Sequence, residues 1–186
     1  TTLLVSVLRK LDAAVDYYLP VRERESHGVH LDGLARMIAG GVQVILTCDT
    51  GITAHAAAEY LRNHDIPFII TDHHTLPDQL PNADAVINPQ RLPSHHPMRG
   101  LPGAGTAFVF SQALCERFGR PELVEENLDL LALGCVADLA ILQGDTRYWV
   151  QRGLESLRTP RRLALLQLMQ NAEINPAHLN EQHIGF

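Results

Sequence analysis

Two nearly continuous apolar stretches, residues 42–48 and 67–70, are separated by one stretch with helical spacing, residues 54–64. Short apolar runs of this kind predict strands that are buried on both faces. A strand, a helix and a second strand in succession predict a parallel pair joined by a right-handed crossover. This part of the chain is therefore constrained to an α/β fold with a parallel sheet and helices on its faces.

Further elements extend the pattern in both directions. Residues 15–19 and 85–87 have the composition of short strands, and the first of these stops at Pro20. Apolar residues three or four apart predict the other helices, at residues 1–10, 31–39, 106–118, 121–136, 145–158 and 160–171. We therefore expect an α/β part over residues 1–105 and a helical continuation over residues 106–186.

The first predicted helix implies a strand before it. A parallel α/β unit ordinarily begins with a strand, whereas residues 1–10 have the character of the helix that follows one. We therefore expect the first strand of the sheet to be missing from this chain, and its place in the sheet to be central.

Composition favours one ordinary globular unit, with 186 residues, 46% hydrophobic and 19% charged. A net charge of -6 argues against a broad basic face for nucleic acid and leaves a local cationic groove as the alternative. The chain has no apolar run of about 18 residues and no signal-peptide layout, so we expect no membrane association and a cytoplasmic protein. Cys48, Cys115 and Cys135 lack Cys-x-x-Cys spacing, which predicts buried thiols rather than disulfides or a zinc site.

Polar side chains follow both central strands at the points where they end. Asp49 comes directly after residues 42–48, and Asp72, His73 and His74 come shortly after residues 67–70. A right-handed crossover places both strand ends on the same rim of the sheet, which is where open α/β sheets bind ligands. We therefore expect these side chains to converge.

Their chemistry suits a divalent ion. Carboxylates with imidazoles and no thiolate favour Mn²⁺ or an ion of similar hardness. Two such ions, about 3.5–4 Å apart, would generate a hydroxide nucleophile for phosphoryl transfer. Asp138, between apolar stretches, is a third carboxylate candidate.

Structural alternatives remain open for each candidate. Asp49 and Asp138 are also suitable helix N-caps, and His73 and His74 are compatible with an ordinary polar loop. The other histidines and basic pairs have simpler interpretations as turn, capping or solvated surface residues: His27, His55, His64, His95, His96, Arg161 and Arg162. A phosphate contact is the alternative for His27.

The ordered motifs resemble the DHH phosphoesterase superfamily, and its RecJ branch in particular. They lie at residues 22–28, 47–52, 71–74 with a continuation to residue 89, 100–108 and 133–138. This resemblance implies a Rossmann-like DHH domain that acts as a 5′-3′ single-stranded-DNA exonuclease in repair and recombination. It also implies two Mn²⁺ or Mg²⁺ ions and, as partners of the intact enzyme, a single-stranded-DNA-binding protein or a helicase.

The same resemblance implies roles for individual residues. Asp49 would bridge the ions, and His73, Asp138 and Asp72 would ligate or orient them, while His74 would contact metal or phosphate. Substrate phosphate would meet the residues Arg22, His27, Gly103 and Gly105, since glycines at a helix start leave N–H groups free for an anion. The family's first motif, Asp-x-Asp-Gly, would lie upstream of Thr1, so we expect the chain alone to hold an incomplete metal set and to be inactive.

Other functions remain as alternatives. Within the superfamily these are a nano-RNA or cyclic-dinucleotide phosphodiesterase and a pyrophosphatase. A non-catalytic nucleic-acid-binding module is a third possibility. Asp49-Thr50-Gly51 also matches the aspartic-protease signature, but a helix follows it and the chain has no second copy.

Overall fold

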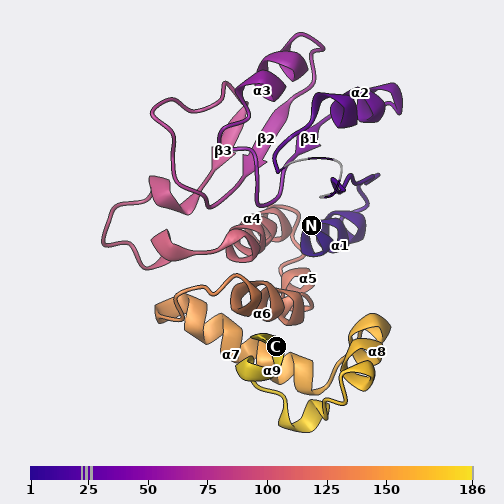
Figure 1. Cartoon of the computed structure of the whole chain (residues 1–186), viewed down its shortest axis with the longest axis vertical. Coiled ribbons are helices and arrows are strands. Elements are labelled where there is room, and N and C mark those ends of the chain that lie inside the picture. Colours follow the sequence, from indigo (N-terminus) through magenta and orange to yellow (C-terminus); the bar gives the residue numbers. More distant parts are fainter. Residues whose placement is uncertain (22, 24, 26, 186) are drawn as a thin grey trace.

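A three-stranded parallel sheet forms the upper part of the molecule (Figure 1). The computed structural model describes residues 1–21, 23, 25 and 27–185. Its strands are β1 (Ile45–Leu46), β2 (Phe68–Thr71) and β3 (Ala85–Ile87), in the order β1-β2-β3. Ile45 pairs with Phe68, and Ile69 pairs with Ala85. The predicted parallel α/β fold is confirmed, although β1 is shorter than the predicted stretch of residues 42–48.

Residues 15–19 do not form the predicted strand. They adopt no regular secondary structure, and Tyr17 and Leu19 are 54% and 56% exposed. Strand composition alone does not make a strand, because the main-chain groups of a strand need a neighbour with which to pair. Among the described residues, none pairs with this segment in the sheet.

Two helices and the sheet enclose the first core. Helix α2 (Leu31–Ala39) and helix α3 (His55–Arg62) pack together beside the strands (Figure 1). Their apolar sides meet the side chains of β1 and β2 in a cluster of buried residues: Leu34, Ile45, Ala57, Ala58, Leu61, Phe68 and Ile70. Burial of a full-sized apolar side chain contributes about 1.5–3 kcal/mol, so this cluster fixes the crossover between β1 and β2.

The second core lies among the helices below the sheet. Helix α1 (Thr2–Lys10) packs on α4 (Gly103–Arg117), and both lie between the sheet and the other helices (Figure 1). The remaining helices are α5 (Glu122–Glu125), α6 (Leu128–Ala137), α7 (Gly144–Arg158), α8 (Leu163–Asn171) and α9 (Glu181–Gly185), with short 3₁₀ turns at Pro89–Arg91, Pro97–Gly100 and Pro176–His178. The predicted boundary between residues 105 and 106 stays a prediction, since α1 contributes Leu3 and Val7 to this helical core.

Two predictions in the helical region need correction. The single helix predicted over residues 121–136 is divided into α5 and α6 around Asn127, whose fully buried amide donates to the Leu123 carbonyl at 3.1 Å. Arg162 is not merely solvated, because its guanidinium bonds the buried Asp129 carboxylate at 2.8 Å and the Asn127 amide oxygen at 2.8 Å. This ion pair attaches the start of α8 to α6.

The cysteines are free thiols. Cys115 and Cys135 are buried as predicted, and burial raises the pKa of Cys135 to about 12. Cys48 is only half-buried. No helix in the described part of the chain is both long enough and apolar enough to cross a membrane.

Candidate metal site

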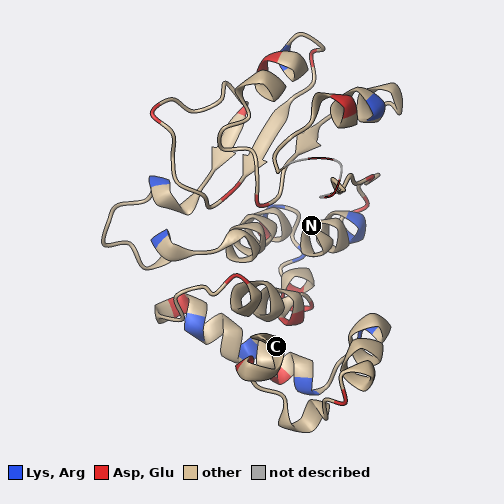
Figure 2. Ribbon diagram, viewed as in Figure 1, with Lys and Arg blue, Asp and Glu red and all other residues tan. Residues whose placement is uncertain are grey.

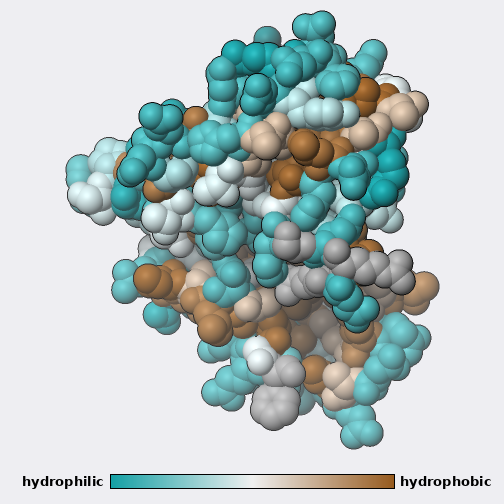
Figure 3. Space-filling view, turned by 45° about the horizontal axis from the view of Figure 1, so that its top comes forward, coloured by the Kyte–Doolittle hydropathy of each residue, from teal (hydrophilic) through white to brown (hydrophobic). Residues whose placement is uncertain are grey.

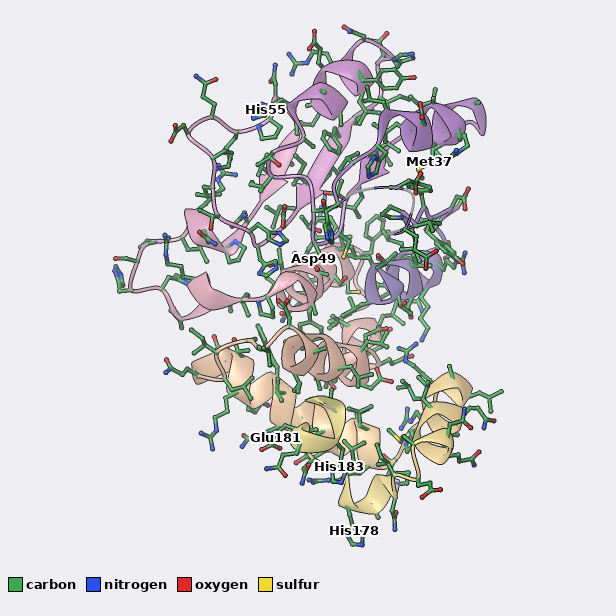
Figure 4. All side chains as sticks on the ribbon, viewed as in Figure 1. Met37, Asp49, His55, His178, Glu181 and His183 are labelled. Atoms are coloured by element: carbon green, nitrogen blue, oxygen red, sulfur yellow. The ribbon has the colours of Figure 1, made fainter. Side chains whose placement is uncertain are left out.

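Asp49 lies in a strained turn directly beyond β1. Its φ of +63° is in the left-handed region that non-glycine residues rarely adopt, and its N–H donates to the Thr71 carbonyl at 2.9 Å. The turn therefore holds the carboxylate at the end of the sheet, between the loops that follow the strands and helix α4 (Figure 4). Helix α3 begins only at His55, so the alternative of Asp49 as its N-cap is wrong.

The buried Asp72 carboxylate organises the histidine loop. It accepts hydrogen bonds from the N–H groups of Ile52, His73 and His74 at 2.9, 2.7 and 3.3 Å, and lies 2.6 Å from His74 Nδ1. Burial acts to raise the pKa of Asp72, but the hydrogen bonds from His74 and from the main chain outweigh it and lower the pKa. Because these donors occupy the carboxylate, its geometry favours an orienting role, while its predicted role as a metal ligand stays untested.

His73 lies between two carboxylates. Its Nε2 is 3.0 Å from Asp49 Oδ1 and 3.6 Å from Asp138 Oδ2. Asp138 follows the last residue of α6, which excludes its alternative role as an N-cap. An acidic group at a helix C-terminus is unfavourable towards the helix dipole, so its position calls for a cationic neighbour.

Three side chains offer a ready set of metal donors. One ligand atom each from Asp49, His73 and His74 lies within 4.8 Å of the other two. Partial burial raises the pKa of the Asp49 carboxyl, opposed by His73 and reinforced by Asp138, while the hydrogen bond to Asp72 raises the pKa of His74. Carboxylate oxygen with imidazole nitrogen fits an ion of intermediate hardness such as Mn²⁺.

Helix α4 begins against the Asp49 carboxylate. A Cβ on Gly103, its first residue, would lie 2.1 Å from Asp49 Oδ1, so only glycine fits there while the Asp49 carboxylate keeps this position. A Cβ on Gly105 would meet Leu101 instead, at 2.9 Å. The structure therefore brings Gly103 to the predicted site and assigns Gly105 to packing.

The other predicted phosphate residues, and the histidines interpreted as turn, capping or surface residues, are less closely connected to the candidate metal site. His27 is exposed, and Arg22 lies outside the described residues. His55 lies well away from Asp49 (Figure 4). His64 contacts the Tyr60 carbonyl through Nδ1 at 2.7 Å, and His96 accepts from the Met98 N–H at 3.1 Å, which agrees with their local structural interpretations.

Sequence reasoning missed the supporting role of two side chains. Gln90 donates through Nε2 to the His73 carbonyl at 2.9 Å, and Asn88 donates to the His74 carbonyl at 2.9 Å. Both residues follow β3, so side chains next to the third strand hold the main chain of His73 and His74 in place. The only signal for Gln90 in the sequence is its place after a predicted strand.

The site combines acidic and imidazole side chains, with Asp49 and Asp138 beside His73 and with Asp72 beside His74. Figure 2 shows Lys, Arg, Asp and Glu scattered over the ribbon, with acidic residues also on the loops where the strands approach α4. A cluster of acids and imidazoles at the carboxyl ends of parallel strands defines a candidate hydrolase centre of the metal-dependent class.

The family comparison agrees with this class. The chain belongs to the DHH family, because the model described as "DHH family, N-terminal domain" matches residues 1–135. The resemblance inferred from the motifs is thus confirmed.

Individual relatives narrow the assignment to RecJ proteins. The chain is 35% identical to the single-stranded-DNA-specific exonuclease RecJ of Bacillus subtilis and 34% identical to that of Escherichia coli, with all of this chain covered. It spans 23% and 34% of the lengths of those two relatives. A crystal structure of exonuclease RecJ bound to manganese matches with a TM-score of 0.88 at 31% identity, covering 100% of this chain and 46% of the other. The crystal structure of RecJ from Thermus thermophilus in complex with Mn²⁺ matches with a TM-score of 0.81 at 30% identity, covering 100% of this chain and 26% of the other.

Proposed function

We propose that this chain forms part of the catalytic domain of a Mn²⁺- or Mg²⁺-dependent exonuclease that degrades single-stranded DNA in the 5′-3′ direction. The observation that carries the proposal is the convergence of Asp49, His73 and His74 at the end of the sheet. The names of the relatives and of the manganese-bound structures support the same activity.

Each side chain of such a site would have its own role. Asp49 and His73 would hold the metal, with Asp138 near the same Nε2 atom of His73, and Asp72 would fix the ring of His74 for metal or phosphate. When bound, two divalent ions supply the positive charge that activates water and offsets the charge growing on the phosphoryl group. The start of α4 at Gly103 presents main-chain N–H groups next to Asp49, where they would stabilise a phosphate oxygen.

The cellular setting extends the same proposal. The enzyme would act in DNA repair and recombination in the cytoplasm, together with a single-stranded-DNA-binding protein or a helicase. We further propose that residues 1–186 alone hold an incomplete metal set and lack nuclease activity, because three close donors fill only part of the coordination that a two-ion centre requires.

Two measurements test these proposals. Calorimetric titration of the chain with Mn²⁺ should show binding that Asp49→Asn and His73→Ala each weaken, whereas His55→Ala, on α3 and away from the site, should leave it unchanged. Equal binding by all four proteins would refute the metal site.

Activity is measured in a form extended upstream by an Asp-x-Asp-Gly motif. Release of nucleotides from end-labelled single-stranded DNA, abolished by Asp49→Ala, is the expected result. Cleavage of cyclic dinucleotides or pyrophosphate in preference to DNA would assign another DHH activity, and DNA binding without any cleavage would indicate a non-catalytic module.

A further inference from the structure

Helices α4 and α6 meet through two of their smallest residues. A Cβ on Gly134 of α6 would lie 2.4 Å from the Cβ of Ala104 on α4. The next nearest atom across the contact is the Ala104 Cα, at 3.8 Å, which is an ordinary van der Waals distance. One methyl group, that of Ala104, therefore separates the two helices at this point.

The contact lies next to the candidate metal site on both helices. On α4, the residue before Ala104 is Gly103, which packs against the Asp49 carboxylate. On α6, the Gly134 carbonyl accepts a hydrogen bond from the Asp138 N–H at 3.1 Å, so Asp138 lies one helical turn beyond the contact. The contact therefore joins the helix that touches Asp49 to the helix that carries Asp138.

His73 completes the arrangement from the sheet. Its Nε2 lies 3.0 Å from Asp49 Oδ1 and 3.6 Å from Asp138 Oδ2. Helix α4 lies between the sheet and α6 (Figure 1). The distance from His73 on the sheet side to Asp138 on α6 therefore depends on how closely α6 approaches α4.

Helix α6 has little freedom to move away from its neighbours. It is apolar on nearly all sides, as is typical of a helix inside a core, and Figure 3 shows hydrophobic residues among the helices in the lower half of the view. A Cβ on Gly153 of α7 would lie 2.2 Å from the Leu128 carbonyl oxygen and 2.5 Å from the Ala132 Cβ, both on α6. Ala132 and Gly134 are about 200° apart around the helix axis, so α6 is in close contact on opposite faces. An extra atom at either face has to move a whole helix.

We propose that Gly134 is a positioning residue of the candidate metal site. Its contact with Ala104 sets the separation of α4 and α6, and that separation sets the distance of the Asp138 carboxylate from His73. This inference rests on the proposed metal site and extends it to a residue that has no side chain with which to bind a metal. A second methyl group would have to open the contact from 2.4 Å to at least 3.4 Å. A displacement of about 1 Å is enough to impair a site whose groups must be held in register.

Four proteins test this spacing: the unaltered chain, Gly134→Ala, Ala104→Gly and the double variant that carries both changes. They place one, two, no and again one methyl group between the helices. In the double variant the methyl group has only changed helix, and the atom nearest to it, the Cα of residue 104, is 3.8 Å away. Circular dichroism and urea unfolding check the fold of each protein. The matched control is Gly185→Ala in α9, where no heavy atom lies within 4 Å of the new Cβ.

The first readout needs no metal. The NMR signals of the His73 ring, assigned with His73→Ala, are compared at one pH with and without Asp138→Asn in each of the four proteins. In the unaltered chain the Asp138 carboxylate is 3.6 Å from Nε2, so loss of its charge should shift the ring signals. In Gly134→Ala this shift should be smaller by about one third or more, because the influence of a charge declines with distance. In the double variant it should return.

The second readout is the affinity for Mn²⁺, measured by calorimetry. We expect it to fall about tenfold or more in Gly134→Ala, as when a metal ligand is disturbed through its neighbours. Ala104→Gly should cause a smaller fall, and the double variant should bind within about twofold of the unaltered chain, because the two changes act on one contact. Gly134→Ala thus weakens binding in the unaltered chain and strengthens it in the Ala104→Gly background. The second comparison decides the matter even where Gly134→Ala alone does not fold.

The outcomes separate this proposal from the metal site itself. Equal ring shifts in all four proteins would overturn the positioning role, whatever the Mn²⁺ result. A double variant that recovers stability in urea, but neither the ring shift nor the Mn²⁺ affinity, would also overturn it, because the contact would then serve folding alone. Ring shifts in the expected order, without Mn²⁺ binding by the unaltered chain, would support the spacing and refute the proposed metal site.

Discussion

Replacement of Gly103 by alanine is a direct test of how the candidate metal site is built. The new Cβ would lie 2.1 Å from Asp49 Oδ1 and 2.4 Å from Asp49 Cγ, while Cβ contacts under 3.0 Å essentially do not occur. The carboxylate must therefore move by about 1 Å, on the scale at which a misplaced catalytic group loses its function. Its side chain is 51% exposed, so it can rotate towards solvent without disturbing the core.

The substitution should thus separate binding from stability. We expect Mn²⁺ affinity to fall about 10–100-fold, the usual effect of disturbing a metal ligand through its neighbour. The free energy of unfolding should change by less than about 1 kcal/mol, because alanine is the better helix former. Calorimetric Mn²⁺ titration and urea unfolding measure the two quantities.

A matched control and a double variant sharpen this test. Gly100→Ala places its Cβ where no heavy atom lies within 4 Å, so it should bind Mn²⁺ like the unaltered chain. In an Asp49→Asn background, Gly103→Ala should have little further effect, since both changes act on one ligand. Unchanged Mn²⁺ affinity in Gly103→Ala alone would refute the assignment of Asp49 as a ligand in its present position.

Two further predictions concern stability. Arg162→Met should lower the free energy of unfolding, measured with urea, by about 2 kcal/mol, because it leaves the buried Asp129 carboxylate without its cation. Arg161 has an exposed side chain, so Arg161→Met should change the free energy of unfolding by no more than about 0.5 kcal/mol. Equal effects would contradict the ion pair. Folding lowers the pKa of the Asp72 carboxyl, so its contribution to the free energy of unfolding is lost as the pH falls below about 4. Folding raises the pKa of the His74 imidazole, so its contribution is lost as the pH rises past about 6.5. The stability difference between the unaltered chain and His74→Ala in chelator should therefore be largest between those limits, and a difference that is flat from pH 4 to 9 would disprove the linkage.

Much of the sheet and its rim could be predicted from local signals. Residues 42–48 and 67–70 are apolar without alternation, and each is followed by acids or histidines. The hydrophobic pattern predicts a strand, a helix and a parallel strand, and a right-handed crossover brings the ends of the two strands to the same rim of the sheet. The approach of Asp49 to His73 was therefore predictable from their spacing in the sequence. The same reasoning correctly located residues 85–87 as a third strand.

Local signals failed where a partner decides the outcome. Residues 15–19 have strand composition but no strand beside them among the described residues, and composition cannot report a missing neighbour. Arg162 appeared to be a surface residue because its partner Asp129 is distant in sequence. Gln90 supports the His73 loop only because β3 pairs with β2.

The sequence by itself determined the α/β class and the family, since hydrophobic period and ordered motifs are written along the chain. Only the tertiary structure decided the roles within the site. It surrounded the Asp72 carboxylate with four donors, placed Asp138 and Asp49 beside the same Nε2 atom of His73, and packed Gly103 against Asp49. These contacts join residues from separate elements, and the packing of those elements, rather than any local preference, sets the distances between them.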